Sequence, residues 1–340
     1  DIDVVGTAPD AMIGLRKIEA LSPDVLTLDV EMPGMDGLTF LERLMKSNPM
    51  PVVMVSAYTE AGSDAAIRSL ELGAVDVVEK PRYEVREGLS NLSELIIDKV
   101  KGAALAQVAS PSARFFEHNT GESAVISVTQ ESLGHAPLEQ LVAIGASTGG
   151  PQAIRQVLEV LPASMPPVLV VQHITPSFTE SFAKSLDTNC QLSVQVGRDG
   201  VCPEPGNVYI APGDRHMLLT KSGTDYVIAL ADHDRVNRHR PSVDELFKSV
   251  AVHAGQRGTG ILLTGMGVDG AVGLKMIRES GGRTFVQDEA SSVVFGMPRA
   301  AVDLDAADTV LDISRIAECL TRYVFRNSEA DKRRRRGDSI

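Results

Sequence analysis

The sequence contains no tryptophan, only three cysteines and no long apolar run. No stretch reaches the roughly 18–20 consecutive apolar residues that a membrane-spanning helix requires, and no secretory signal pattern opens the chain. We therefore predict that the protein is not inserted in a membrane. Its cysteines, Cys190, Cys202 and Cys319, have neither C-x-x-C nor metal-ligand spacing. This pattern favours the reducing environment of the cytoplasm.

Basic residues are also in short supply. The chain has 33 lysines and arginines against 45 aspartates and glutamates, a formal net charge of −12. An acidic protein repels the phosphate backbone, so nucleic acid is disfavoured as the main partner. The exception is the run KRRRR at residues 332–336. A terminal run of like charges is usually solvated, and we predict that residues 326–340 form a disordered basic tail.

The rest of the sequence is typical of a two-domain α/β protein. Its 340 residues suffice for two domains of roughly 100–200 residues each. In both halves short β-branched runs alternate with amphipathic patterns, which predicts two doubly wound parallel sheets covered by helices. The first domain is expected at residues 1–100 and the second at 138–325. A polar segment at 101–137, rich in turn formers, is the predicted linker.

The predicted strands are short aliphatic or β-branched runs bounded by turn formers. In the first half they are residues 1–6, 24–30, 51–57 and 74–80. In the second half the buried parallel strands are residues 141–146, 168–173, 260–267, 283–288 and 308–313. Residues 207–214, 216–220 and 225–230, which are separated by turn residues, instead predict a small antiparallel insert.

Three polar residues, Asp29, Ser56 and Lys80, end successive strands of the first half. Because the carboxyl ends of parallel strands meet at one edge of a sheet, these residues are expected to lie together. There a carboxylate can accept a phosphoryl group, a hydroxyl can hydrogen-bond it, and an ammonium can pair with it. A single strand-end aspartate is most often a turn or cap residue. Three such residues on successive strands indicate an anion-handling site.

These residues resemble the receiver domain of two-component response regulators. The shared motifs are Asp29 followed by MPGMDG, Ser56 on the next strand, and Lys80 before Pro81. The resemblance implies Mg²⁺-dependent phosphorylation of Asp29 by a partner histidine kinase, with Ser56 and Lys80 in support. Receivers begin with a strand that ends in an acidic pair, whereas DIDVVG matches their second strand, so we expect a domain without its first strand and helix. Asp29 and the Glu31 carbonyl are then too few ligands, and the Mg²⁺ site is expected to be incomplete.

The second half opens on LVAIGASTGGP, residues 141–151, which has two interpretations. A strand, a glycine turn and a proline suited to a first helical turn can form a phosphate cradle. The same residues match G-x-S-x-G and present Ser147 as a nucleophile. The phosphate interpretation lacks its partners. The glycines do not fit G-x-G-x-x-G, no acidic residue ends the next strand, and no Lys-Ser/Thr pair follows Gly150.

The nucleophile interpretation requires a base and a group that orients it. His173 ends the next apolar strand, and Asp269 lies in the GMGVDG turn after a third strand, so parallel pairing places all three at one edge. Backbone N–H groups near Met266, or at Thr148, are candidate donors to an oxyanion. The order Ser, His, Asp differs from the Ser, acid, His of α/β-hydrolases. Taken singly, each residue also has a structural explanation, as a helix cap, a buried histidine or a turn residue.

Residues 138–325 resemble the catalytic domain of the chemotaxis protein-glutamate methylesterases. The motifs that carry the likeness are AIGASTGGP, the QH pair, YIAPGDRHM, NRHRPSVDELF, ILLTGMGVDG and VFGMPRAA. A receiver joined to such a domain is that family's architecture. The resemblance implies Ser147 as nucleophile, His173 as general base and acid, and Asp269 as the orienting acid. It also implies that the Met266 amide contributes to the oxyanion hole.

The same resemblance implies a substrate and its control. A phosphorylation-regulated esterase would remove methyl groups from glutamates of chemoreceptor cytoplasmic helices and deamidate receptor glutamines, without a cofactor for the esterase step. The unphosphorylated receiver would cover the edge of the active site. His239 and Arg240 are further candidates for the active-site wall, although Pro241 and Ser242 equally suit a helix start. The alternatives are a non-catalytic receiver-linked signalling module and a receiver-switched hydrolase of another ester.

Overall fold

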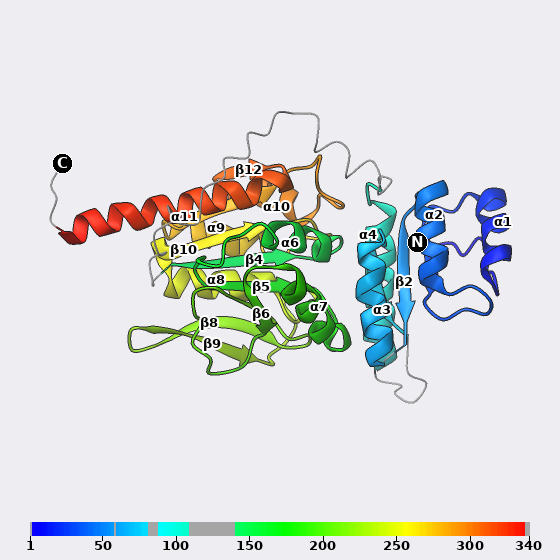
Figure 1. The fold of residues 1–340 in the computed structure, drawn as a ribbon, viewed down its shortest axis with the longest axis horizontal. Coiled ribbons are helices and arrows are strands. Elements are labelled where there is room, and N and C mark those ends of the chain that lie inside the picture. Colours follow the sequence, from blue (N-terminus) through cyan, green and yellow to red (C-terminus); the bar gives the residue numbers. More distant parts are fainter. Residues whose placement is uncertain (1, 58, 81–87, 109–139, 337–340) are drawn as a thin grey trace. The chain divides into compact units, whose positions relative to one another are not determined.

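A computed structural model of the chain describes residues 2–57, 59–80, 88–108 and 140–336. The chain divides into two compact units, Asp1–Val125 and Ile126–Ile340, and each unit has its own parallel sheet (Figure 1). Within the described residues, no helix has both the length and the apolar character needed to span a bilayer. The α/β class predicted from the sequence is confirmed for both units.

The described part of the first unit has a parallel sheet with the strand order β1-β2-β3. Its elements are α1 (Ala11–Leu21), β1 (Leu26–Asp29), α2 (Gly37–Ser47), β2 (Val52–Ser56), α3 (Glu60–Glu71), β3 (Asp76–Glu79) and α4 (Gly88–Ala104). Three of the helices begin where a polar side chain accepts a hydrogen bond from a first-turn amide, namely Asp10, Asp36 and Thr59. The sheet core is aliphatic, because Val52, Val53 and Met54 of the central strand are fully buried.

One expectation for this unit needs correction. The first predicted strand, residues 1–6, is wrong as far as the structure describes it, because residues 2–8 have no regular secondary structure. A strand needs a hydrogen-bonded neighbour, and among the described residues β1 pairs only with β2. The predicted linker is helical at its start, since α4 continues to Ala104. Most of that linker, residues 109–137, lies outside the described residues.

The described part of the second unit has a seven-stranded parallel sheet in the order β12-β11-β10-β4-β5-β7-β6. Its strands are β4 (Leu141–Ala146), β5 (Val168–Gln172), β6 (Ser193–Val196), β7 (Asn207–Ile210), β10 (Gly258–Leu262), β11 (Arg283–Gln287) and β12 (Thr309–Leu311). From β4 the chain extends to β6 on one side and to β12 on the other. The strand order therefore reverses between β4 and β10, which is where ligands bind in open α/β sheets.

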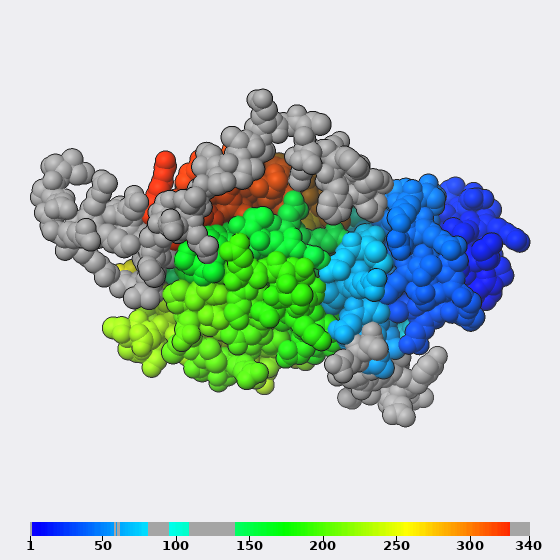
Figure 2. Space-filling view, in the orientation of Figure 1, coloured from blue at the N-terminus to red at the C-terminus, as the bar shows by residue number. Residues whose placement is uncertain are grey.

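Helices cover this sheet in two layers (Figure 1). In one layer α6 packs with α7 and α11, and in the other α9 packs with α8 and α10. The bounds are α6 (Gly150–Leu158), α7 (Pro176–Asn189), α8 (Val243–His253), the 3-10 turn η3 (Gly255–Arg257), α9 (Ala271–Glu279), α10 (Met297–Asp303) and α11 (Ile313–Arg336). Every residue of β4 and β5 is buried, and side chains hide both strands in the space-filling view (Figure 2).

The antiparallel insert is smaller than predicted. It is the hairpin of β8 (His216–Ser222) and β9 (Asp225–Ala231), which packs against α8. Residues 207–214 were expected in it, but β7 pairs in parallel with β5 and β6 of the main sheet. A short apolar run between turn residues fits a hairpin strand and a buried parallel strand equally well. Of its two partners, β5 lies earlier in the chain across α7, and β6 was not among the predicted strands, so the pattern alone does not identify them.

The predicted disordered tail is wrong for residues 326–336, which continue α11 as far as Arg336. Once a helix is nucleated, each added residue contributes a hydrogen bond, and alanine, glutamate, lysine and arginine are good helix formers. Residues 337–340 lie outside the described residues.

Candidate active site

Ser147 lies in a sharp turn between β4 and α6, the strand–turn–helix arrangement that the sequence predicted. Within this turn Gly149 has φ of 75°, in the left-handed region that suits glycine. A Cβ atom on Gly149 would come within 2.5 Å of the Val293 Cβ. The turn beside Ser147 therefore requires glycine for its backbone conformation and also for space.

Hydrogen bonds from two neighbouring strands fix the backbone of Ser147. Its N–H donates to the Thr264 carbonyl over 3.0 Å, and its carbonyl accepts from Gly150 N over 2.7 Å. The Gln172 side chain, at the end of β5, donates from Nε2 to the same carbonyl over 2.9 Å. Thr264, which follows β10, donates from Oγ1 to the Thr148 carbonyl over 3.0 Å. This loop is therefore held from β5 and from β10, and its serine has a defined position.

The structure brings His173 and Asp269 into direct contact. His173 Nε2 lies 2.9 Å from Asp269 Oδ2, and both side chains are buried. Ser147 and His173 each come directly after a register pair of β4 and β5, namely Ala146 and Gln172. The His173 N–H also donates to the Ala146 carbonyl over 3.2 Å. The three residues predicted to act together thus lie at the same carboxyl edge of the sheet, with His173 and Asp269 in direct contact.

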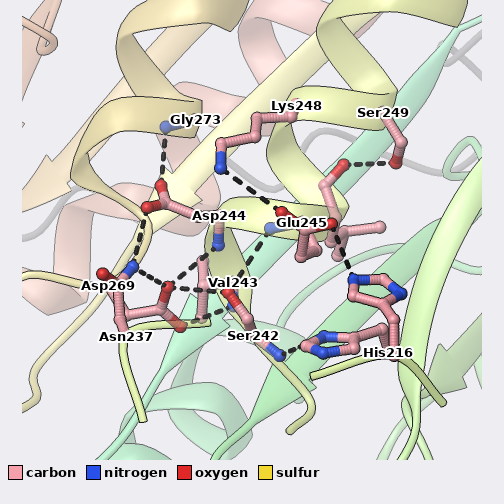
Figure 3. Close-up of polar contacts among 12 residues, drawn as sticks. His216, Asn237, Ser242, Val243, Asp244, Glu245, Lys248, Ser249, Asp269 and Gly273 are labelled. Carbon is pink, nitrogen blue, oxygen red and sulfur yellow. Dashed lines mark hydrogen bonds and ion pairs between the residues drawn. The ribbon is translucent and has the colours of Figure 1, made fainter. Parts of the chain in front are cut away.

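Asp269 precedes α9 in the sequence, but its carboxylate lies against the amino end of α8. Asp269 does not cap α9, because Gly270 is the N-cap of that helix. The Asp269 carboxylate instead accepts hydrogen bonds from Ser242 Oγ (2.8 Å), Val243 N (2.7 Å) and Asp244 N (3.3 Å), as Figure 3 shows. The first N–H groups of a helix lack intrahelical acceptors, and the helix dipole favours a negative charge there. The amino end of α8 therefore stabilises the ionised form of this carboxylate.

Asn237 bridges Asp269 and a second acid. Its Nδ2 atom donates to Asp269 Oδ1 over 2.8 Å and to Asp244 Oδ2 over 2.9 Å. Burial alone would raise the pKa of Asp269. Hydrogen bonds from His173, Asn237 and Val243, together with the positive charge that His173 carries when it is protonated, outweigh burial and hold that pKa well below its usual range. Burial raises the pKa of Asp244. Asp269 is thus the ionised carboxylate that faces the histidine.

A tight turn at residues 236–239 places the imidazole of His239 against that of His173. Val236 and His239 exchange two backbone hydrogen bonds of 3.1 and 2.9 Å, and the residues between them, Asn237 and Arg238, have φ of 51° and 70°. At the end of this turn the His239 ring stacks on the His173 ring, with centroids 3.6 Å apart and planes 12° apart. The structure therefore places His239 against the predicted base.

Arg240, predicted beside His239, is directed elsewhere. Its guanidinium binds Asp214 Oδ1 over 3.0 Å and the carbonyls of Asp232 and His233 over 2.6 and 3.0 Å. These contacts join the turn before β8 to the segment after β9. The helix-start explanation for the following residues is confirmed as well, because Ser242 is the N-cap of α8 and accepts from Glu245 N.

The sequence analysis missed Asn237 and the part that Ser242 plays at Asp269. An asparagine in a two-residue turn after a β-branched residue signals a tight hairpin. That signal predicts the turn but not its contact with an aspartate 32 residues further along the chain.

The predicted oxyanion donors border Ser147. Between Leu141 and Arg336, no backbone carbonyl accepts a hydrogen bond from the N–H of Thr148 or Met266. Gly265, which precedes Met266, approaches the serine so closely that a Cβ there would lie 2.7 Å from the Ser147 Cβ. Both amides are therefore available to an oxygen atom beside the serine.

In the first unit the structure joins two of the three predicted residues. Lys80 Nζ lies 2.7 Å from Asp29 Oδ2 at the carboxyl edge of the sheet. The hydroxyl of Ser56 is buried and donates to the Gly62 carbonyl of α3 over 2.8 Å. Ser56 and Lys80 are linked through the backbone, since Lys80 N donates to the Ser56 carbonyl over 2.8 Å. Pro81, the next residue of the motif, lies outside the described residues.

The described residues fit a Mg²⁺ site only in part. In the described part of the chain, no three acidic, histidine or cysteine side chains are grouped to hold a metal. Asp29 Oδ1 accepts a hydrogen bond from the Glu31 N–H over 2.9 Å, and Oδ2 pairs with Lys80. One carboxylate and one backbone carbonyl are too few ligands for a well-held divalent ion.

Comparisons with known proteins agree with this geometry. The family model described as CheB methylesterase matches residues 142–320, and that of the response regulator receiver domain matches residues 1–89. The chain belongs to the CheB methylesterase family. Within the family it is 49% identical over 321 residues to the protein-glutamate methylesterase/protein-glutamine glutaminase of Salmonella typhimurium, covering 94% of this chain and 88% of that protein. A protein of the same name from Bordetella parapertussis is 50% identical over 324 residues, covering 95% and 90%.

A solved structure of this family also resembles the second unit. The crystal structure of the Thermotoga maritima CheB methylesterase catalytic domain matches with a TM-score of 0.54 and 38% sequence identity. The match covers 54% of this chain and 98% of that one. The likeness therefore extends over a complete catalytic domain of the CheB family.

Proposed function

We propose that this chain is a phosphorylation-regulated serine esterase that removes methyl groups from methylglutamate residues of chemoreceptors and deamidates receptor glutamines. Its relatives carry both activities in their name. The observation that carries the proposal is the buried contact of His173 Nε2 with Asp269 Oδ2, at the sheet edge where Ser147 follows the neighbouring strand. An ionised carboxylate against an imidazole supplies the orienting group that a serine nucleophile requires.

In this proposal each nitrogen of the His173 ring has its own role. Because Nε2 faces Asp269, it carries the proton of the neutral ring, and Nδ1 holds the lone pair. In the proposed reaction Nδ1 takes the Ser147 hydroxyl proton as Oγ attacks the γ-carbonyl carbon of the substrate. Asp269 then stabilises the imidazolium that forms. The C–O bond to the methoxy group breaks next, and methanol leaves with the proton from His173.

Water completes the cycle. It gives a proton to His173 and attacks the acyl-serine ester, which releases glutamate and returns the proton to Ser147. The N–H groups of Thr148 and Met266 are the proposed donors to the oxyanion in both steps. A glutamine amide follows the same route with ammonia as the leaving group, because ester and amide share acyl chemistry. No step of this cycle calls for a cofactor.

We assign control to the first unit. Asp29 is the proposed phosphate acceptor, a chemotaxis histidine kinase the phosphate donor, and Mg²⁺ the ion that the receiver match implies. The pairing of Lys80 with Asp29 supports this assignment, because an ammonium 2.7 Å from the carboxylate is placed to bind the phosphoryl group. A cytoplasmic location belongs to the same proposal, supported by the free state of Cys190, Cys202 and Cys319.

Methanol release from methylated chemoreceptor membranes tests the proposed activity. We expect the wild-type chain to release methanol and Ser147→Ala to release none above background, with unchanged binding to the membranes. Absence of release by the wild type would contradict the esterase assignment and favour a non-catalytic signalling module. Methanol release from a simple methyl ester, without methanol release from receptors, would favour a hydrolase with another substrate. Equal release by Ser147→Ala would contradict the assignment of the nucleophile.

A further inference from the structure

A second buried histidine lies behind the carboxylate of Asp269. His216 begins β8, and its side chain is fully buried. Its Nδ1 lies 3.2 Å from the backbone N of Ser242, and its Nε2 lies 3.1 Å from the carbonyl oxygen of Asp234. Since the backbone N–H is a donor and the carbonyl an acceptor, Nδ1 accepts and Nε2 donates. These two contacts define one neutral tautomer.

The surroundings keep the ring in that form. Burial lowers the pKa of His216, so the neutral imidazole persists at physiological pH. The His233 ring stacks on it with centroids 4.2 Å apart and planes 15° apart. His233 is itself exposed and lies 3.2 Å from Glu245 through Nε2 and Oε2. A ring with a fixed tautomer and fixed plane offers a well-placed acceptor to Ser242.

Ser242 connects this ring to the proposed catalytic acid. Its N–H donates to His216, while its hydroxyl donates to Asp269 Oδ1 over 2.8 Å, as Figure 3 shows. The side chain is fully buried, so neither group has water as a ready substitute. His216 lies on the hairpin insert, and Ser242 carries the connection from that hairpin to Asp269.

We propose that His216 is a positioning residue for Asp269, acting through the backbone N–H and the hydroxyl of Ser242. The inference rests on the catalytic role proposed for Asp269. Ser242 is followed directly by Val243 and Asp244, whose amides also bind that carboxylate. A shift of Ser242 therefore moves, as one group, three of the hydrogen-bond donors that bind the Asp269 carboxylate. His216 fixes the backbone from which these donors extend, and through them it sets the angle at which Asp269 meets His173.

A pair of variants separates this role from general packing. The amide oxygen of asparagine reaches the position of Nδ1, so His216→Asn keeps an acceptor for Ser242 N–H. Glutamine reaches the position of Nε2 instead, so His216→Gln keeps a donor to Asp234 and loses the acceptor. We expect His216→Gln to lower kcat for methanol release by about 10-fold, because it leaves the buried Ser242 N–H without its acceptor and so displaces Asp269. His216→Asn should recover most of that loss, and KM should stay within about twofold of wild type in both, because neither variant touches the substrate.

The matched control uses His253, in the last turn of α8 and away from Asp269. His253→Asn and His253→Gln are expected to have wild-type kcat. Equal kcat for His216→Asn and His216→Gln, at equal thermal midpoints, would overturn the proposal and leave His216 as a packing residue. A wild-type chain that releases no methanol would contradict the esterase assignment instead. The two failures are therefore distinguishable.

A spectroscopic measurement tests the same coupling without an activity assay. ¹⁵N NMR of the wild type should show His216 protonated on Nε2 and unprotonated on Nδ1. In Asp269→Asn the His216 Nδ1 resonance is expected to shift, because the loss of charge at Asp269 relaxes Ser242. In His216→Gln, where it folds, the low-field proton shared by His173 and Asp269 should shift or broaden. A His216 resonance that is identical in the wild type and in Asp269→Asn would overturn the coupling.

Discussion

The imidazole of His239 stacks on the imidazole of His173, with centroids 3.6 Å apart and planes 12° apart. The two residues are 66 positions apart, and they meet because the turn at residues 236–239 is anchored at its other end. Asn237 of that turn donates to Asp269, the same carboxylate that binds His173 Nε2. One short turn therefore contacts the acid through its asparagine and the imidazole through its histidine.

The stacked ring is expected to contribute to catalysis by restricting the plane of His173. Aromatic pairs contribute about 0.5–1.5 kcal/mol beyond their buried area, so His239→Ala should lower kcat by about 2- to 12-fold. His239→Phe keeps an aromatic surface and should retain most of the activity. Initial rates of methanol release at saturating substrate provide the measurement. A phenylalanine variant as slow as the alanine variant would contradict a role for stacking.

Asn237 is expected to matter through its side-chain amide. Asn237→Gly preserves the positive φ of 51° without strain and removes the hydrogen bonds to Asp269 and Asp244. A hydrogen bond to a charged group contributes about 1.5–3 kcal/mol, so kcat should fall by at least about 10-fold. The matched variant Arg238→Gly changes the neighbouring residue of the same turn, whose φ is 70°. If both variants lowered kcat equally, the turn conformation and not the amide would be responsible.

Gly265 is expected to be intolerant of a side chain. A Cβ atom there would lie 2.3 Å from Met297 Sδ and 2.7 Å from the Ser147 Cβ, so the serine or its neighbour must move. A displacement of about 1 Å at a reacting group can cost about 100-fold in rate, and we expect Gly265→Ala to lose at least about 10-fold in kcat. Gly14→Ala is the control, because its Cβ would meet the Phe40 ring at an ordinary 3.6 Å. Wild-type kcat in Gly265→Ala would show that the loop yields without displacing Ser147.

Asp269 is expected to make the second unit sensitive to acid. Its pKa in the folded chain is held well below the 3.8 of a free aspartate, so the folded state binds the proton less readily than the unfolded state. The stability it contributes is therefore fully present above about pH 4 and is lost as the pH falls towards the folded pKa. Urea unfolding of the wild type and Asp269→Asn, measured from pH 6 downwards, should give stabilities that converge only below about pH 4. Convergence above pH 5 would contradict the depressed pKa.

Phosphorylation is expected at a single aspartate of the first unit. Because the described residues offer too few ligands for a tightly held Mg²⁺, a chemotaxis histidine kinase or a small phosphoryl donor should label the wild-type chain only with Mg²⁺ in excess, and Asp29→Asn should remain unlabelled. Asp24→Asn, an exposed aspartate just before β1, is the control and should label normally. Lys80→Ala should bind or transmit the phosphoryl group less well, because it removes the ammonium that pairs with Asp29. Label retained in Asp29→Asn would place the acceptor elsewhere.

The sequence by itself determined the element types and the predicted catalytic residues. Alternating β-branched and amphipathic patterns predicted the parallel sheets, and turn residues after strands marked Ser147, His173 and Asp269. These signals are local, because propensity and periodicity depend on residues within one turn or one strand. They fail where a partner strand has no clear signal of its own, as for β7 beside β6, or where a β-branched run has no hydrogen-bonded partner among the described residues, as for residues 2–6.

Only the tertiary structure decided what surrounds the predicted catalytic residues. Asn237, Ser242 and His216 carry no sequence signal for catalysis, since each has an ordinary local explanation as a turn residue, a helix cap or a buried histidine. They contact Asp269, or one another, because α8 begins where the turn at residues 236–239 and the loop after β10 meet. A buried carboxylate must be hydrogen-bonded, and the donors that satisfy it come from whichever segments the fold places around it.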